Sequence, residues 1–236
     1  MKIVSLILGL ILSSTSVAAD VIRIGFSHFP PLSSVDDGIC RGLFCELTKE
    51  IFEQELGLKV QAVEHPWERI QRQVELGKID VMLALPSEHR RGYGLISEEP
   101  IYLSEMKVFT YKDHPRLDEI KSITTLDDIK QKNLTCITNQ GNAWHEKNVA
   151  SLGIPTVHAI SDEHIIKMLA AQRGDLVIDM APSMQLMMDN LNLTSKLIST
   201  GVTLDRAEIH VIVSRRSSFA DRMPEINEII ASMNLR

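Results

Sequence analysis

One short segment limits strongly what this chain can fold into: a nearly continuous apolar run from Ile79 to Leu85 (IDVMLAL). The run is too short for a helix, and its lack of polar alternation is typical of a parallel strand that is covered on both faces. An amphipathic helix is predicted just before it, between Pro66 at the first helical position and the terminating Gly77. We therefore expect this strand at the centre of an α/β sheet.

The residues that follow this strand carry positive charge. Residues 86–92 (PSEHRRG) leave its carboxyl end, which is the edge at which open α/β sheets bind ligands. The sequence thus predicts a cationic loop, containing Arg90 and Arg91, beside a ligand-binding cleft. We expect neither arginine to contribute to core packing.

The rest of the chain alternates between strand and helix patterns. The predicted strands lie at 21–26, 59–64, 102–111, 134–139, 156–160, 176–179 and 207–215, and the predicted helices at 43–56, 125–132, 143–152, 162–173, 182–191 and 219–233. Asp162 is predicted to cap the helix that begins there. Strand-helix alternation of this kind implies largely parallel sheets.

Several motifs resemble those of one protein family. GKID at 77–80, Ser-x-x-Arg at 87–90 and ISEEPIY at 96–102 resemble the G-x-[IV]-D, [ST]-x-x-R and F-S-x-P-Y motifs of bacterial extracytoplasmic solute-binding proteins, family 3, the polar amino-acid type. Further similar segments are LDDIKQKNL at 126–134, QGNA at 140–143 and VSRRSS at 213–218. Together these motifs extend over essentially all of the chain after residue 19.

The resemblance implies an α/β fold of the two-lobed periplasmic-binding-protein type (type II), with a mixed, mostly parallel sheet in each lobe. Lobe 1 is expected to comprise residues 20–107 and 208–236, and lobe 2 residues 108–207. The two crossings of extended chain between the lobes, near Val108 and Glu208, would form a hinge.

The first residues have the pattern of a secretory signal peptide. Lys2 precedes an apolar stretch at 3–12, and Val17-Ala18-Ala19 is a small-residue cleavage site. The stretch is shorter than the ~20 residues that a membrane-spanning helix requires, and a retained N-terminal anchor is the alternative. We expect cleavage after Ala19 and a periplasmic location. Loss of the single charge of Lys2 changes the formal net charge from −6 to −7, and an acidic exported chain is not expected to bind nucleic acid.

Export would place the three cysteines of the chain in an oxidising compartment. Cys40 and Cys45 flank a loop-to-helix junction, where a local disulfide and two free thiols are equally compatible with the sequence. Cys136 alternates with Leu134 and Thr138 on a predicted buried strand, and we interpret it as a small core residue. No histidine lies at metal-ligand spacing, so we predict neither a metal site nor a cofactor.

The resemblance also indicates which residues would contact a ligand. Arg90, with Ser87 three residues before it, matches the family's guanidinium clamp for a ligand carboxylate, a contact to which the planar fork of arginine is suited. Arg91 is the neighbouring alternative, as part of a solvated basic turn. Phe29 and Trp67 match aromatic positions on the walls of the cleft, although either could instead pack in the core.

In lobe 2 the match to the family is less regular. Asn142 stands at a helix start where the family usually has Ser or Thr, and free N–H groups there suit an anionic group. Asp179 lies near the family's acidic residue for a ligand amino group, but it follows Asp175 by four positions instead of five, so Met180 is the alternative. Residues 84–86 (ALP) replace the small polar residues that hold the α-ammonium in the family's amino-acid binders. We therefore expect a carboxylate-bearing ligand, with its α-amino acid nature left open.

The resemblance implies a solute-binding protein that closes on a small carboxylate-bearing solute, an amino acid or a related molecule, and delivers it to the membrane permease of an ABC transporter. We expect a monomer that catalyses no reaction. One alternative is an enzyme similar to cyclohexadienyl dehydratases, for which Glu88 and Asp179 are the cleft-side candidates for a general acid. A ligand-sensing partner of a membrane receptor is the other.

Overall fold

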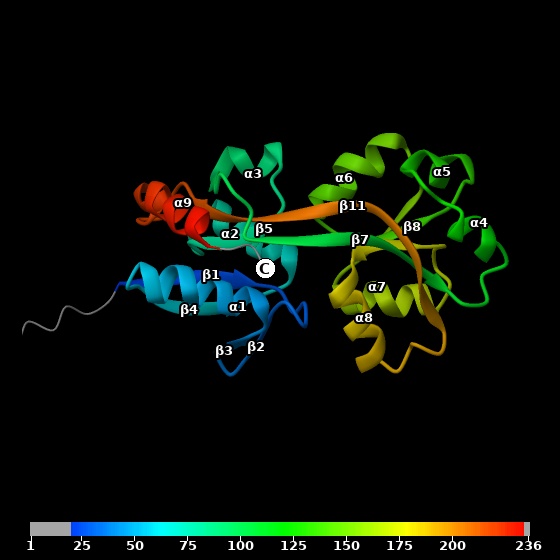
Figure 1. Cartoon of the computed structure of the whole chain (residues 1–236), viewed down its shortest axis with the longest axis horizontal. Helices are drawn as coiled ribbons and strands as arrows, with labels where there is room; N and C mark the ends of the chain where they lie inside the picture. The colour runs from blue at the N-terminus through cyan, green and yellow to red at the C-terminus, as the bar shows by residue number, and fades with distance from the viewer. Residues whose placement is uncertain (1–19, 234–236) are drawn as a thin grey trace, which may run out of the picture.

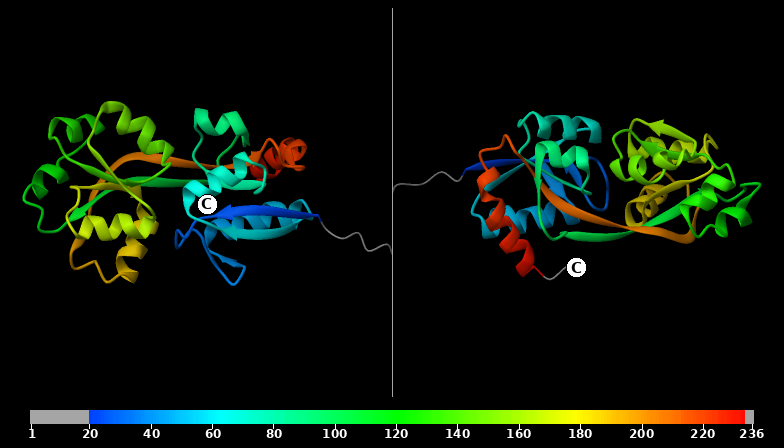
Figure 2. Two further views of the ribbon diagram at one scale, coloured as in Figure 1. Left: turned by 180° about the vertical axis from the view of Figure 1, so that it is seen from behind. Right: turned by 90° about the horizontal axis from the view of Figure 1, so that it is seen from above.

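The computed structural model describes residues 20–233. These residues form two α/β lobes joined by two long strands (Figure 1). The same division is visible from behind and from above (Figure 2). The predicted signal peptide, residues 1–19, lies outside the described residues. In residues 20–233, no helix combines the length and apolar character that a membrane span needs.

Lobe 1 is built around the apolar run that the sequence places at the centre of a sheet. Its strands are β1 (Val21–Phe26), β2 (Ser34–Asp36), β3 (Ile39–Arg41), β4 (Lys59–Glu64), β5 (Val81–Ala84) and β6 (Gly94–Ile96). Strand β5 lies between β1, to which it is parallel, and β11 (Leu197–Ser214), to which it is antiparallel. All of its residues are buried, which confirms the predicted central strand.

The helices of lobe 1 cover both faces of this sheet. They are α1 (Leu43–Thr48), the π-helical segment η1 (Lys49–Glu55), α2 (Trp67–Glu75), α3 (Glu88–Tyr93), the 3₁₀ segment η3 (Ala220–Arg222) and α9 (Met223–Ser232). The apolar face of α2 is fully buried at Ile70 and Val74 and packs with Met82 of β5 and Ile212 of β11. The predicted helix at 43–56 is thus present but changes from α to π geometry at Lys49.

Lobe 2 contains the second alternating series. Its elements are α4 (Leu117–Lys121), α5 (Leu126–Gln131), β8 (Cys136–Asn139), α6 (Ala143–Asn148), the 3₁₀ segment η2 (Ala150–Leu152), β9 (Thr156–Ala159), α7 (Asp162–Ala170), β10 (Val177–Met180) and α8 (Ala181–Asn190). Strands β8 and β9 are parallel, and a bridge between Cys136 and Leu176 places β8 beside the start of β10.

Strands β7 (Tyr102–Tyr111) and β11 run through both lobes. They pair antiparallel from one end of β7 to the other, with register irregularities between Ser199 and Asp205. The resulting sheet has the order β10-β7-β11-β5-β1-β4, and β6 also pairs with β11. The sheets are therefore mixed, as predicted: β1, β4 and β5 are parallel, and antiparallel pairing occurs where the long strands join them.

Several local elements differ from the sequence-based prediction, and in three of them the cause is visible. The cationic loop after β5 is the short helix α3, because the Ser87 hydroxyl caps it by accepting a hydrogen bond from the backbone N–H of Arg90 at 3.2 Å. Helix α7 is capped by Ser161, and Asp162 is its first helical residue. The last strand begins at Leu197 instead of 207, because its first part gains its hydrogen bonds from β7 and has no continuous apolar pattern.

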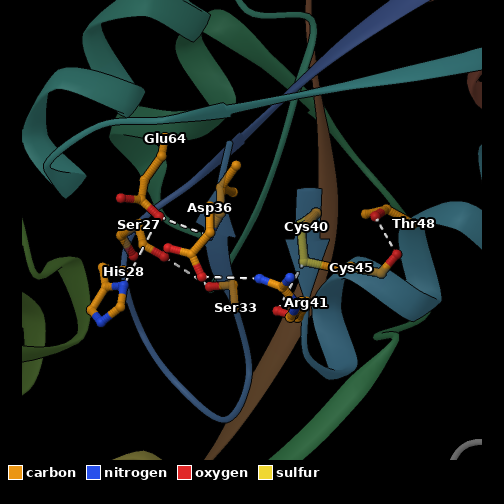
Figure 3. The surroundings of a disulfide bond; sticks show 10 residues. Ser27, His28, Ser33, Asp36, Cys40, Arg41, Cys45, Thr48 and Glu64 are labelled. Atoms are coloured by element: carbon orange, nitrogen blue, oxygen red, sulfur yellow. Dashed lines mark hydrogen bonds and ion pairs between the residues drawn. A yellow bond between two sulfur atoms is a disulfide. The ribbon is translucent and has the colours of Figure 1, made fainter. Parts of the chain in front are cut away.

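A disulfide joins Cys40 and Cys45 (Figure 3), so the first of the two sequence-based alternatives is correct. It links β3 of the β2–β3 hairpin to α1. Within the hairpin, Arg41 and Asp36 form an ion pair at 3.0 Å, and Glu64 of β4 accepts a hydrogen bond from a hairpin backbone N–H at 2.8 Å. The disulfide and the contact with Glu64 hold the hairpin against the rest of lobe 1.

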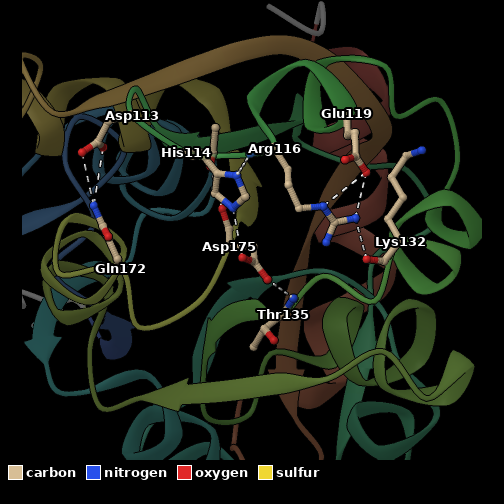
Figure 4. A network of polar contacts seen from close by, with 9 residues as sticks. Asp113, His114, Arg116, Glu119, Lys132, Thr135, Gln172 and Asp175 are labelled. Carbon is tan, nitrogen blue, oxygen red and sulfur yellow. Dashed lines mark hydrogen bonds and ion pairs between the residues drawn. The ribbon is translucent and has the colours of Figure 1, made fainter.

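The end of lobe 2 that lies away from lobe 1 contains a polar network (Figure 4). The carboxylate of Asp175 accepts hydrogen bonds from Nε2 of His114 at 3.0 Å and from the backbone N–H of Thr135 at 2.6 Å. Nδ1 of His114 accepts the backbone N–H of Arg116 at 2.9 Å, so Nε2 carries the ring hydrogen. The network joins the segments that precede β8 and β10 to the segment that follows β7.

Candidate functional site

A cavity lies between the two lobes. Residues at the carboxyl ends of β1, β5, β8 and β10 line it, together with residues from the amino-terminal turns of α2 and α6. It contains about 790 Å³ of empty space, part of which is open to solvent. Its place at the carboxyl ends of the strands agrees with the expectation from the sequence.

Arg90 forms part of the lobe 1 wall, and its side chain is almost fully buried, with 2% of its surface exposed. Nε and Nη2 donate to Oε1 of Gln71 at 3.1 and 2.9 Å, and Nη1 donates to the carbonyl oxygen of Leu85 at 2.7 Å. Nη2 also donates to the carbonyl oxygen of Gly141 at 3.3 Å. The expectation that Arg90 contributes nothing to the core is therefore wrong, because the guanidinium joins several buried segments.

Trp67 and Arg90 are stacked at the same wall. The guanidinium carbon of Arg90 lies 5.2 Å from the centre of the Trp67 ring, within the range of a cation–π contact. Burial lowers the pKa of Arg90, and the stacking partly compensates the guanidinium for its lost hydration. Arg91 is exposed and does not line the cavity, so the two arginines differ as the motif match implies.

Lobe 2 touches lobe 1 through Gly141, just before α6. Its carbonyl oxygen accepts hydrogen bonds from Trp67 Nε1 and Gln71 Nε2, both at 3.2 Å, in addition to the one from Arg90. Gly141 has a positive φ of 71°, and a Cβ atom there would lie 2.6 Å from Gln71 Nε2. Glycine suits this position, because its φ favours glycine and a side chain would displace the Gln71 amide. The sequence analysis missed Gln71, although its i+4 spacing from Trp67 places both on one face of α2.

The lobe 2 wall carries two buried carboxyl groups. Asp162 accepts a hydrogen bond from Nδ2 of Asn139 at 2.9 Å, and Asp179 accepts one from the backbone N–H of Met180 at 2.7 Å. Burial raises the pKa of Asp162 to about 7, with a contribution from the charge of Asp179, and burial raises the pKa of Asp179 to about 6. A carboxylate can accept about four hydrogen bonds, and each of these accepts far fewer. A proton or a cationic partner would therefore stabilise both groups.

The predicted site residues separate into two groups. Phe29, Trp67, Arg90, Asn142 and Asp179 all line the cavity, and so does Met180. Ser87 does not line it and acts instead as the cap of α3, as described above. The structure adds Asp162 to the lining residues. The sequence analysis had assigned it a capping role, because no local pattern shows that the start of α7 meets the end of β10.

Two further residues singled out in the sequence, Asn142 and Glu88, differ in their position relative to the cavity. The Asn142 side chain caps α6 by accepting the backbone N–H of His145 at 3.1 Å. Glu88 is exposed and does not line the cavity. Among residues 20–233, no three His, Cys, Asp or Glu side chains are placed to hold a metal ion.

Residues 22–234 match the model of the bacterial extracellular solute-binding proteins, family 3. The chain belongs to this family. The resemblance noted from its motifs is thereby confirmed. No curated protein shows significant sequence similarity to the chain.

Several solved structures have the same fold as this protein. The arginine-bound form of a truncated ArgBP from T. maritima is 20% identical, with a TM-score of 0.73 over 91% of this chain and 96% of that chain. A histidine kinase sensor domain with similarity to periplasmic binding proteins is 20% identical, with a TM-score of 0.76 over 90% of each chain. An ancestral arginine-binding protein bound to arginine is 22% identical, with a TM-score of 0.72 over 90% of this chain and 92% of that one. At this identity the similarity shows the fold.

Proposed function

We propose that this protein binds a small solute that carries both a carboxylate and a cationic group, and delivers it to the membrane permease of an ABC transporter. The observation that carries the proposal is the opposite charge of the two cavity walls, with Arg90 in lobe 1 and Asp162 and Asp179 in lobe 2. Amino acids and related zwitterions have this charge pattern. The arginine-bound proteins that share the fold bind a solute of this kind.

Binding is proposed to close the lobes around the solute. We place the lobe boundaries at residues 107/108 and 207/208, so that β7 and β11 provide the two hinge segments. Aromatic side chains at the cavity, Phe29 and Trp67 among them, would cover the apolar part of the solute. The closed state is then favoured by the contacts that the solute makes with both walls.

We further propose that the chain is exported as a monomer and cleaved after Ala19. The family is extracellular, and the Cys40–Cys45 disulfide is compatible with an oxidising compartment such as the periplasm. Mass spectrometry of periplasmic extract should find a chain that begins at Asp20. Recovery of intact Met1 from that fraction would contradict the predicted cleavage.

Thermal-shift screening of the purified protein tests the ligand class. Zwitterionic solutes such as L-arginine, L-lysine and L-glutamine should raise the melting temperature, since a ligand at 100 times its dissociation constant adds about 2.7 kcal/mol of stability. The Asp162→Asn/Asp179→Asn double variant should lose this response and retain its fold. Stabilisation by purely anionic or uncharged solutes alone would contradict the charge-pattern proposal.

Ligand sensing is the second candidate, and the similarity to a histidine kinase sensor domain favours it. Uptake of the radiolabelled solute separates the two roles. Deletion of the gene should abolish uptake if the protein supplies a permease. Normal uptake in the deletion strain would instead support a sensory role.

A further inference from the structure

The side chain of Gln71 connects the two lobes beside the cavity. Its Oε1 atom accepts hydrogen bonds from Nε of Arg90 at 3.1 Å and from Nη2 of Arg90 at 2.9 Å. Its Nε2 atom donates to the carbonyl oxygen of Gly141 in lobe 2 at 3.2 Å. The edge formed by Nε and Nη2 is suited to two parallel hydrogen bonds with a carboxylate. Gln71 thus occupies one of the guanidinium edges that could bind the carboxylate of the proposed solute.

The neighbours of the Gln71 carboxamide fix its orientation. With oxygen and nitrogen exchanged, its N–H groups would face the N–H groups of Arg90, and its oxygen would face the carbonyl oxygen of Gly141. Both contacts would then be repulsive. The carboxamide therefore presents an acceptor to lobe 1 and a donor to lobe 2, which is the pattern of the carboxylate and ammonium ends of a zwitterion.

Two features make this bridge replaceable. The carbonyl oxygen of Gly141 is shared by donors from Trp67, Gln71 and Arg90 at 3.2, 3.2 and 3.3 Å. These distances are long for N–H···O bonds, because one oxygen must distribute its lone pairs among all of them. In addition, a neutral amide oxygen binds a guanidinium more weakly than a carboxylate does. A solute carboxylate can therefore displace Gln71 from Arg90.

From this geometry we infer that Gln71 is a specificity-determining residue that competes with the solute for Arg90. Without solute it bridges Arg90 and Gly141 and holds the lobes together. Gln71 is not among the described residues that line the cavity, whereas Arg90 and Trp67 are. The hydrogen bond from Gln71 to the carbonyl oxygen of Gly141 can be made only while lobe 2 lies against lobe 1. The inference rests on the proposed contact between Arg90 and a solute carboxylate.

Gln71→Ala in the full chain tests both parts of this inference. Small-angle scattering of the solute-free variant should give a larger radius of gyration than the wild type, because one of the three hydrogen bonds from lobe 1 to the carbonyl oxygen of Gly141 is lost. Its dissociation constant for L-arginine should fall about three- to tenfold, the effect expected when one competing hydrogen-bonded group is removed. The dissociation constant for agmatine, which is arginine without its carboxylate, should not change.

Gln71→Glu separates competition from bridging. The new carboxylate would pair with Arg90 but would repel the carbonyl oxygen of Gly141. The solute-free variant should therefore also expand, whereas its dissociation constant for L-arginine should increase. Gln73→Ala on the same helix is the matched control, because no hydrogen bond of the Gln73 side chain is found within residues 20–233, and it should change neither quantity.

Identical scattering by the wild type and Gln71→Ala would overturn the inference, whichever solutes bind. Weaker L-arginine binding by Gln71→Ala would also overturn it, because Gln71 would then position Arg90 instead of competing for it. If no charged solute binds the wild type, the proposed function fails. The scattering comparison still decides in that case whether Gln71 bridges the lobes.

Discussion

The two walls of the cavity satisfy their charged groups differently. In lobe 1, Arg90 donates hydrogen bonds to Gln71 and to the carbonyl oxygens of Leu85 and Gly141. In lobe 2, Asp162 and Asp179 each accept a single hydrogen bond within the described part of the chain. The charge of Arg90 thus has hydrogen-bond partners, most of them in lobe 1, whereas the carboxyl groups of lobe 2 are short of partners.

The difference applies to the solute-free protein, in which the hydrogen bonds of Arg90 are made and the two carboxyl groups lack partners. A buried charge with its hydrogen bonds made is stable without a ligand, whereas a buried carboxylate with few partners takes up a proton or a cation. The raised pKa values of Asp162 and Asp179 have this cause. Removing the charged group should therefore destabilise the protein at the lobe 1 wall and stabilise it at the lobe 2 wall.

Arg90→Ala should have the largest effect on folding. It leaves the Gln71 amide oxygen and the carbonyl oxygen of Leu85 without their donor, so we expect the free energy of unfolding to fall by about 3–5 kcal/mol. Urea denaturation of the solute-free protein measures this change. Arg91→Ala is the control and should change the free energy by less than about 0.5 kcal/mol, because Arg91 is exposed. If both substitutions changed the free energy of unfolding equally, the hydrogen bonds of Arg90 would not stabilise the lobe 1 wall as described.

Asp162→Asn should stabilise the solute-free protein at pH 8. The folded state holds the Asp162 proton up to a pKa of about 7, whereas the ordinary value is 3.8. Wild-type stability therefore declines as the pH rises from about 4 to 7, and the variant lacks this loss. We expect a gain of about 2–4 kcal/mol at pH 8 that vanishes below about pH 4. Denaturation curves across this range measure it, and a gain that is independent of pH would contradict the assignment.

The disulfide in lobe 1 makes a smaller contribution to the free energy of unfolding. The Cys40→Ser/Cys45→Ser variant should lose about 2 kcal/mol of stability, since the bridge closes only a short loop. Alkylation of the denatured, non-reduced wild type should label one thiol per chain, that of Cys136. Labelling of all three thiols before reduction would show that the bridge does not form in the cell. Cys136 itself is buried, and burial raises the pKa of its thiol to about 12.

Local sequence patterns were sufficient for the fold class. The apolar run of β5 and the strand-helix alternation predicted an α/β protein. The resemblance of the ordered motifs to the family implied two lobes with mixed sheets, and a single site containing Phe29, Trp67, Arg90 and Asp179. Predictions were poorer where a tertiary contact replaces the local pattern. The polar first part of β11 is a strand because β7 supplies its hydrogen bonds.

What the sequence determined by itself is therefore the order of the elements and the family, because hydrophobic periodicity and motif spacing are local properties. Only the tertiary structure decided how far the charged groups are buried and which hydrogen bonds they make. Asp162 meets the end of β10 and becomes buried beside Asp179, and Gln71 reaches Arg90 and Gly141 across positions far apart in the chain. Burial and hydrogen bonding set the energy of a charge, and both depend on which distant segments the fold brings together.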